Sequence, residues 1–185
     1  MDFIEQIRSA LASRQRATLP AGPVPAAVLI PLFLKNGSWH ILFTKRTDHL
    51  QHHRGEISFP GGVRHPEDRD LLQTALRESW EEVGIEPSDV QILGQLDDFF
   101  SIHNYHVTPY VGVIPGNYPF APSPDEIERL MEVPLEALRD PTIFRAEEWQ
   151  RDGIQRLVYF YRYGDDEIWG LTAAMLKQFL DTVFA

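Results

Sequence analysis

The stretch RESWEEVGI, residues 77–85, brings three carboxylates together at the end of a predicted helix that begins near residue 68. Apolar residues recur at helical spacing over 68–83, and the glycine and proline that follow are typical of a helix end. At roughly 100° per residue, Glu78, Glu81 and Glu82 form a stripe beside the apolar face and not opposite it. That apolar face comprises Leu72, Ala75, Leu76, Ser79 and Val83.

This acidic stripe is unfavourable unless something compensates its charge. Like charges three or four positions apart destabilise an isolated helix by about 0.2 to 0.5 kcal/mol per pair, and partial burial adds a desolvation cost. A divalent cation would reverse the balance, because Mg²⁺ and Mn²⁺ prefer carboxylate oxygens and Mg²⁺ commonly shares its ligands with substrate phosphates. The alternative is a solvated helix face on which Arg77 and other basic side chains pair with the glutamates.

The residues around the acidic stripe favour its interpretation as a cation-binding site. The stretch from Gly62 to Ile85 resembles the signature of the Nudix hydrolases, which cleave a diphosphate linked to another group. Its end follows the pattern Arg-Glu-apolar-any-Glu-Glu-any-Gly-apolar, except that Ser79 replaces the usual aliphatic residue. Its front half departs further, because Asp68 stands where glutamate is usual and lies one residue farther from Arg77. We interpret Asp68 as a helix cap.

The segment immediately upstream, LFTKRTDHLQHHRGEISFPGG over residues 42–62, narrows the resemblance. It is similar to the additional signature of the coenzyme A diphosphatase branch of the Nudix hydrolases, with departures at Phe43, Thr47 and Gln51. Stretches at 106–114, 124–135 and 167–180 also look like this branch, so the resemblance covers roughly residues 24–180. The matching anchors are Leu42, Thr44, Arg46, Gly55, Phe59, Pro60, Gly61 and Gly62.

The resemblance implies a fold and a metal site. The expected architecture is an α/β fold of mixed type, an α/β/α sandwich around a mixed β-sheet. Glu78 and Glu82, one turn apart, would hold Mg²⁺ or Mn²⁺, with Glu81 as a further ligand or as a base outside the ligand set. Arg77 would orient a glutamate instead of touching the substrate; the simpler alternative for Arg77 is a surface ion pair.

A basic segment in an otherwise acidic chain suggests how an anionic substrate binds. Lys45, Arg46 and Arg54 lie within ten residues of one another, and guanidinium groups bind phosphate in a fork. Gly61 and Gly62 would let the loop approach the helix closely, although a simple turn would also explain them. The histidines among these residues, His49, His52 and His53, lack the second ligand cluster that a zinc site requires.

If the branch assignment holds, the substrate is coenzyme A or a derivative of it, cleaved to adenosine 3′,5′-bisphosphate and 4′-phosphopantetheine. Another nucleoside diphosphate derivative, such as ADP-ribose or a dinucleotide, is the alternative substrate. A non-catalytic nucleotide-binding module is the alternative class, which the retention of all three glutamates with Arg77 disfavours. Glu126 is the candidate general base or extra ligand from a loop, with plain stabilisation of a helix start as its alternative role.

Composition limits the protein's class. The chain has 185 residues, 43% of them hydrophobic, which suits one domain over 1–185 with an N-terminal helix and connector over 1–23. A net charge of −10 argues against general nucleic-acid binding. Cysteine is absent, the apolar run at 24–34 is too short to cross a membrane, and residues 1–14 do not resemble a signal peptide, so we expect a cytoplasmic protein.

The order of predicted elements fits a mixed sheet flanked by helices. A hairpin over 26–47 is predicted from its β-branched and aromatic residues and from Asn36–Gly37 at its turn. Trp149, Phe160 and Tyr161 could belong to the core or to the interface of a homodimer. The other predicted elements are a helix over 3–11, strands near 90–97 and 106–114, helical turns at 125–131 and 134–138, a strand pair within 156–169 and a helix over 171–183.

Overall fold

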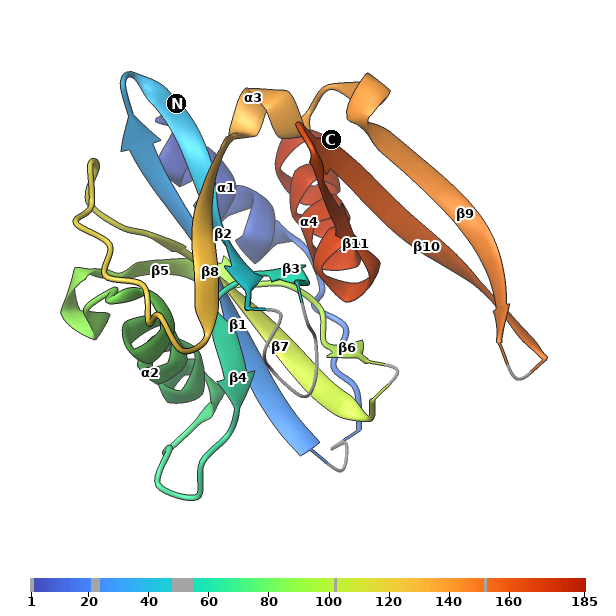
Figure 1. The fold of residues 1–185 in the computed structure, drawn as a ribbon, viewed down its shortest axis with the longest axis horizontal. Coiled ribbons are helices and arrows are strands. Elements are labelled where there is room, and N and C mark those ends of the chain that lie inside the picture. Colours follow the sequence, from blue (N-terminus) through green and yellow to red (C-terminus); the bar gives the residue numbers. More distant parts are fainter. Residues whose placement is uncertain (1, 21–23, 48–54, 102, 152) are drawn as a thin grey trace.

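The computed structural model of the chain describes residues 2–20, 24–47, 55–101, 103–151 and 153–185 (Figure 1). The helices are α1 (Phe3–Ser13), α2 (Leu71–Val83), α3 (Leu135–Leu138) and α4 (Gly170–Phe184), with short 3-10 turns at Pro87–Asp89 and Pro141–Ile143. The strands are β1 (Val24–Lys35), β2 (Ser38–Arg46), β3 (Ile57–Ser58), β4 (Gly61–Val63), β5 (Gln91–Gln95), β6 (Phe99–Phe100), β7 (Tyr105–Val113), β8 (Ile127–Pro134), β9 (Phe144–Arg151), β10 (Ile154–Tyr163) and β11 (Asp166–Trp169).

The larger sheet is mixed, as predicted. Its main path runs β3-β2-β1-β7-β5, with β4 paired to β1, β6 to β7 and β8 to β2. The β1–β2 hairpin closes at Asn36 and Gly37, whose φ angles of 51° and 80° are the left-handed values that this dipeptide tolerates. The parallel pair in this sheet joins β1 to β7. The structure therefore confirms the predicted hairpin over 26–47, and β5 and β7 confirm the strands predicted near 90–97 and 106–114.

Helices cover both faces of the larger sheet, because β1 is apolar on both of its sides. Side chains on the two sides of β1 belong to different cores. One face packs against α1 and α4, and the other packs against α2 (Figure 1). The residues of β1 on the α1 and α4 side are Ala26, Ile30 and Leu32, and those on the α2 side are Ala27 and Leu29. The arrangement is the expected α/β/α sandwich.

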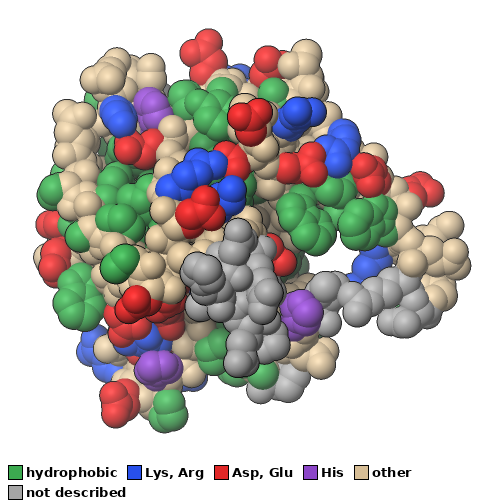
Figure 2. Space-filling view, viewed as in Figure 1, with side chains coloured by type: hydrophobic (Ala, Val, Ile, Leu, Met, Phe, Trp, Pro, Cys, Tyr) green, Lys and Arg blue, Asp and Glu red, His purple; other side chains and the backbone are tan. Residues whose placement is uncertain are grey.

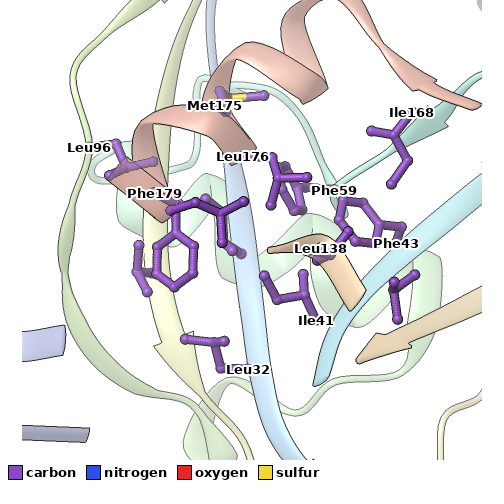
Figure 3. Packing of buried hydrophobic residues seen from close by; sticks show 14 of the residues in the cluster. Leu32, Ile41, Phe43, Phe59, Leu96, Leu138, Ile168, Met175, Leu176 and Phe179 are labelled. Carbon is purple, nitrogen blue, oxygen red and sulfur yellow. The ribbon is translucent and has the colours of Figure 1, made fainter. Parts of the chain in front are cut away.

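Among the three clusters of buried hydrophobic residues in the described part of the chain, the core beneath α4 is the most extensive. Figure 3 shows Leu176 and Phe179 of α4 facing Ile41 and Phe43 of β2 and neighbouring strands. Phe43 stacks on Phe59 with ring centroids 4.8 Å apart. Phe59 follows β3 and directly precedes the segment that leads into β4, so this contact holds the chain before the double glycine against the sheet.

A smaller antiparallel sheet, ordered β11-β10-β9, extends from the main body as a long hairpin (Figure 1). The sequence predicts the β10–β11 pair but not β9. Phe160 and Tyr161 are buried within one chain, whereas Trp149 is 45% exposed, and hydrophobic side chains gather on this sheet in Figure 2. Phe160 and Tyr161 are therefore core residues. Association of two copies stays a prediction, as does a cytoplasmic location.

Two local predictions are wrong. Residues 125–131 are not helical, because β8 begins at Ile127 and pairs with β2 from His40 to Arg46. Glu126 therefore does not stabilise a helix start. The helix α2 begins at Leu71 and its cap is Asp70, whose carboxylate accepts the Gln73 amide, so Asp68 is not the cap. Among the described residues, no helix is long and apolar enough to span a bilayer.

Candidate metal and diphosphate site

The acidic stripe lies on the side of α2 that faces the sheet and the double glycine. Exposure of its side chains falls steeply across it: 43% for Glu81, 16% for Glu78 and 2% for Glu82. Glu82 thus belongs to the interior, on the face that also buries Ala75 and Val83. A solvated helix face does not account for Glu82, because a buried carboxylate requires specific partners.

Glu82 has a partner for each of its oxygens. Arg46 Nη1 donates to Oε1 at 3.0 Å, and the Gly61 amide donates to Oε2 at 3.1 Å. Burial nevertheless raises the pKa of Glu82 to about 7, with the Arg46 charge and the Gly61 hydrogen bond opposing the shift. Gly61 of the double glycine and Arg46 of the upstream segment therefore both contact the carboxylate of Glu82.

Glu78 and Glu81 share a single arginine. Arg77 Nη1 donates to Glu78 Oε1 at 2.9 Å and to Glu81 Oε2 at 3.0 Å. Burial raises the pKa of Glu78 and the Arg77 hydrogen bond partly offsets this shift. Arg77 thus contacts two of the three glutamates, and its role in orienting a glutamate stays a prediction.

Asp68 holds Arg77 from the other side. Arg77 Nε and Nη2 donate to Oδ1 and Oδ2 of Asp68, each at 3.0 Å, and Nη2 also donates to the Val63 carbonyl. Asp68 is buried and also accepts from the Thr74 hydroxyl and the His65 amide. These hydrogen bonds, that of Arg77 foremost, hold the pKa of Asp68 well below its usual range. The sequence signal for this role is that Asp68 stands where the Nudix signature has glutamate.

The two adjacent glycines are confined by different atoms. A Cβ on Gly61 would lie 2.4 Å from the Ala27 carbonyl oxygen and 2.7 Å from Val28 Cα, both in the β1 backbone. A Cβ on Gly62 would lie 2.5 to 2.7 Å from the carboxylate of Glu78. Gly61 therefore permits the pairing of β4 with β1, and Gly62 permits Glu78 to reach its position.

Arg46 and Lys45, two of the basic residues predicted to bind the substrate, point to different parts of the structure. Arg46 enters the site and also lies 3.6 Å from Glu126 Oε2, because the Thr47 amide donates to the Glu126 carbonyl at the end of the β2–β8 pairing. Lys45 is directed elsewhere, 3.7 Å from Glu128 and 3.5 Å from Asp166. The structure therefore brings Arg46, Glu126, Gly61 and Gly62 to the glutamates but not Lys45. Arg54 and the three neighbouring histidines fall outside the described residues.

The donor chemistry of this cluster fits a divalent ion. Glu78 and Glu82 carry hard oxygen donors on adjacent turns, and the carboxylate of Glu78 occupies the space that a Cβ on Gly62 would need. Within the described part of the chain, however, no three acidic or histidine side chains converge as they would around an ion. Arg46 and Arg77 hold the oxygens instead. An ion bound through Glu78 and Glu82 would compete with Arg77 and Arg46 for the carboxylate oxygens that these arginines contact.

The chain is similar to members of one known protein family. The family model described as the NUDIX domain matches residues 23–157. The uncharacterized Nudix hydrolase NudL of Yersinia pestis is 41% identical over 158 residues, which cover 85% of this chain and 79% of the relative. NudL of Yersinia pseudotuberculosis matches to the same extent.

Solved structures also share the fold. An Ap4A hydrolase of C. elegans, in a binary complex, aligns with a TM-score of 0.51 and 21% identity over 61% of this chain and 81% of its own. The Nudix hydrolase RenU of M. smegmatis aligns with a TM-score of 0.53 and 19% identity over 63% of this chain and 73% of its own. At these identities the similarity concerns the fold alone.

Proposed function

Because the chain belongs to the Nudix hydrolase family, whose members use divalent metal ions to hydrolyse nucleoside diphosphate derivatives, we propose that it cleaves the diphosphate of coenzyme A or a derivative. The products would be adenosine 3′,5′-bisphosphate and a 4′-phosphopantetheine. One observation carries the proposal. Arg46 and Gly61, from the segment that resembles the coenzyme A diphosphatase signature, both contact Glu82 of the Nudix signature.

Each residue of the cluster has a proposed role. Glu78 and Glu82 hold Mg²⁺ or Mn²⁺, and Glu81 is a further ligand or a base beside them. A bound ion would neutralise the diphosphate oxygens and lower the pKa of a water that attacks phosphorus. Arg77 orients Glu78 and Glu81 and does not contact substrate. Arg46 supplies positive charge to the diphosphate, and the double glycine allows the chain to approach α2.

Glu126 is the proposed general base, or an extra ligand. It lies at the start of β8 beside Arg46, and its side chain is 43% exposed, so it can reach a water without a large desolvation cost. Glu128 offers a matched control, because its side chain is equally exposed but pairs with Lys45. We expect Glu126→Gln to lower kcat by roughly 10²- to 10⁴-fold and Glu128→Gln to change it less than about twofold. Equal effects would remove Glu126 from this role.

A substrate panel tests the proposed activity directly. The protein is incubated with coenzyme A, ADP-ribose and a diadenosine polyphosphate in Mg²⁺ or Mn²⁺, and the products are separated by chromatography. We expect coenzyme A to be cleaved with the highest kcat/KM. Preference for ADP-ribose or the dinucleotide would replace the proposed substrate, and absence of metal-dependent cleavage would favour a binding module.

The panel is repeated with Glu82→Gln, which keeps the shape of the side chain but removes the charge that binds metal. We expect this variant to remain folded and to lose most activity on every substrate. Glu86→Gln is the control, since Glu86 is an exposed glutamate just after α2 that pairs with Trp80. An active Glu82→Gln variant would contradict the metal-binding role of Glu82.

A further inference from the structure

We propose that Arg46 neutralises Glu82 in the metal-free protein and is displaced from it when the divalent ion binds, which frees Arg46 for the substrate diphosphate. This inference rests on the proposed function for its metal and its substrate. It goes beyond that function because Arg46 and the divalent ion would compete for the carboxylate of Glu82. Metal binding and substrate binding would then be coupled through Arg46.

The first argument is the burial of Glu82. A carboxylate that is 2% exposed is strongly destabilising without a countercharge, and Arg46 Nη1 at 3.0 Å supplies one. The Gly61 amide is a dipole fixed in the backbone and cannot leave, so Oε1 is the oxygen that becomes available when Arg46 moves. An ion at Glu82 would supply the countercharge in place of the guanidinium.

The second argument is that Arg46 is incompletely bonded. Its Nε is buried and has no hydrogen-bond partner among the described residues, and its Nη2 reaches Glu126 only at 3.6 Å. A guanidinium carries five N–H donors, and a fork of phosphate oxygens satisfies them better than one carboxylate oxygen. Arg46 therefore has donors available for a diphosphate.

The third argument is the contrast with Arg77. Arg77 is fixed by two hydrogen bonds to buried Asp68 and one to the Val63 carbonyl in addition to its glutamate contacts. Among the residues that the structure describes, Arg46 has no comparable anchor to a buried acid other than Glu82. It follows a register shift between Lys45 and Arg46 at the end of β2, an irregularity that redirects a side chain out of the regular alternation. The two arginines thus differ: Arg77 is a fixed positioning residue and Arg46 is the displaceable one.

Mn²⁺ binding without substrate tests the competition. Wild type, Arg46→Gln, Arg46→Lys and Lys45→Gln are titrated with Mn²⁺ and the free ion is measured by electron paramagnetic resonance. We expect Arg46→Gln to bind Mn²⁺ roughly fivefold or more tightly than wild type, because the ion no longer competes with a guanidinium. Arg46→Lys, which keeps the charge but not the fork, should fall between them, and Lys45→Gln should match wild type. Unchanged or weaker binding by Arg46→Gln would overturn the inference.

Displacement itself is visible by NMR. The Arg46 Nε–H signal, assigned by its loss in Arg46→Lys, should shift when Mg²⁺ is added to the wild-type protein. The signal of Arg77 Nε–H, bonded to Asp68, should move less. An unmoved Arg46 signal at saturating Mg²⁺ would show that the arginine stays on Glu82. Failure of wild type to bind either ion would instead remove the proposed metal site, so the two failures are distinguishable.

Discussion

The guanidinium of Arg77 and the carboxylate of Asp68 form a two-point pair, with Nε and Nη2 each 3.0 Å from a different oxygen. Asp68 precedes α2 and Arg77 lies in its middle, so the pair joins the loop after β4 to the helix that carries the glutamates. The remaining Arg77 nitrogen contacts Glu78 and Glu81. The position of two glutamates therefore depends on a residue outside the acidic stripe.

Asp68→Asn should destabilise the protein and loosen Arg77. The substitution leaves one oxygen acceptor and places an amide donor against the guanidinium, so we expect a loss of about 1 to 3 kcal/mol in the free energy of unfolding. Activity should fall as well, because Glu78 and Glu81 lose the arginine that orients them. Urea unfolding and kcat on the cleaved substrate are the measurements.

Asp70→Asn is the control for this variant. Asp70 caps α2 through the Gln73 amide, and asparagine caps a helix about as well as aspartate. It should change the free energy of unfolding by less than about 0.5 kcal/mol. Equal losses in the two variants would contradict the role of the Asp68–Arg77 pair.

The same pair predicts how stability depends on pH. The Arg77 hydrogen bonds lower the pKa of Asp68 in the folded protein, whereas an aspartate in the unfolded chain has a pKa of about 3.9. Its contribution to stability is therefore complete above about pH 4 and is lost as pH falls further, because only the unfolded chain takes up the proton. Urea unfolding of wild type and Asp68→Asn from pH 7 to 3 should show a difference that narrows below pH 4. A difference independent of pH would count against the linkage.

Gly62→Ala should affect the site more than the fold. The added Cβ meets the far end of the flexible Glu78 side chain, which can rotate away at little cost to folding. We expect a loss of less than about 1 kcal/mol in the free energy of unfolding. Mn²⁺ affinity and kcat should both fall, since Glu78 leaves its position. Thermal unfolding and Mn²⁺ titration separate these effects.

Gly61→Ala should do the reverse and damage the fold first. Its Cβ meets the backbone of β1, which cannot move without disturbing the centre of the sheet. We expect a loss of about 2 kcal/mol or more in the free energy of unfolding, measured by urea. If both alanine variants behaved alike in stability, the separate roles of the two glycines would be wrong.

The local features of this fold are predictable from the sequence. Gly84 ends α2 with a φ of 73°, and Asn36 and Gly37 form the turn of the hairpin, because each of these conformations depends on a few adjacent residues. The glutamate stripe follows from helical periodicity alone. These elements are decided by short-range chemistry that the sequence displays directly.

The wrong predictions concern residues whose structure is decided by contacts with distant parts of the chain. Residues 125–131 follow Pro124 and begin with acidic residues that suggest a helix start, but pairing with β2 makes the residues from Ile127 onward the beginning of β8. Two aspartates precede α2, and only the three-dimensional structure shows that Asp70 caps it while Asp68 is buried against Arg77. Lys45 and Arg46 are adjacent cations in sequence, yet their side chains contact different acids on separate elements.

The parallel pairing of β1 with β7 also constrains how the chain is made. Val24 pairs with Tyr105 and Leu32 with Val113, so the central strand of the sheet emerges from the ribosome long before its parallel neighbour exists. Closing so long a loop carries an entropic cost that local hairpins avoid, and such topologies fold slowly. The edge of β1 that pairs with β7 stays unpaired meanwhile, and the side of β1 that faces α4 lacks that helix. Nascent chains arrested before residue 105 should therefore bind chaperones, and release should follow once β7 is synthesised.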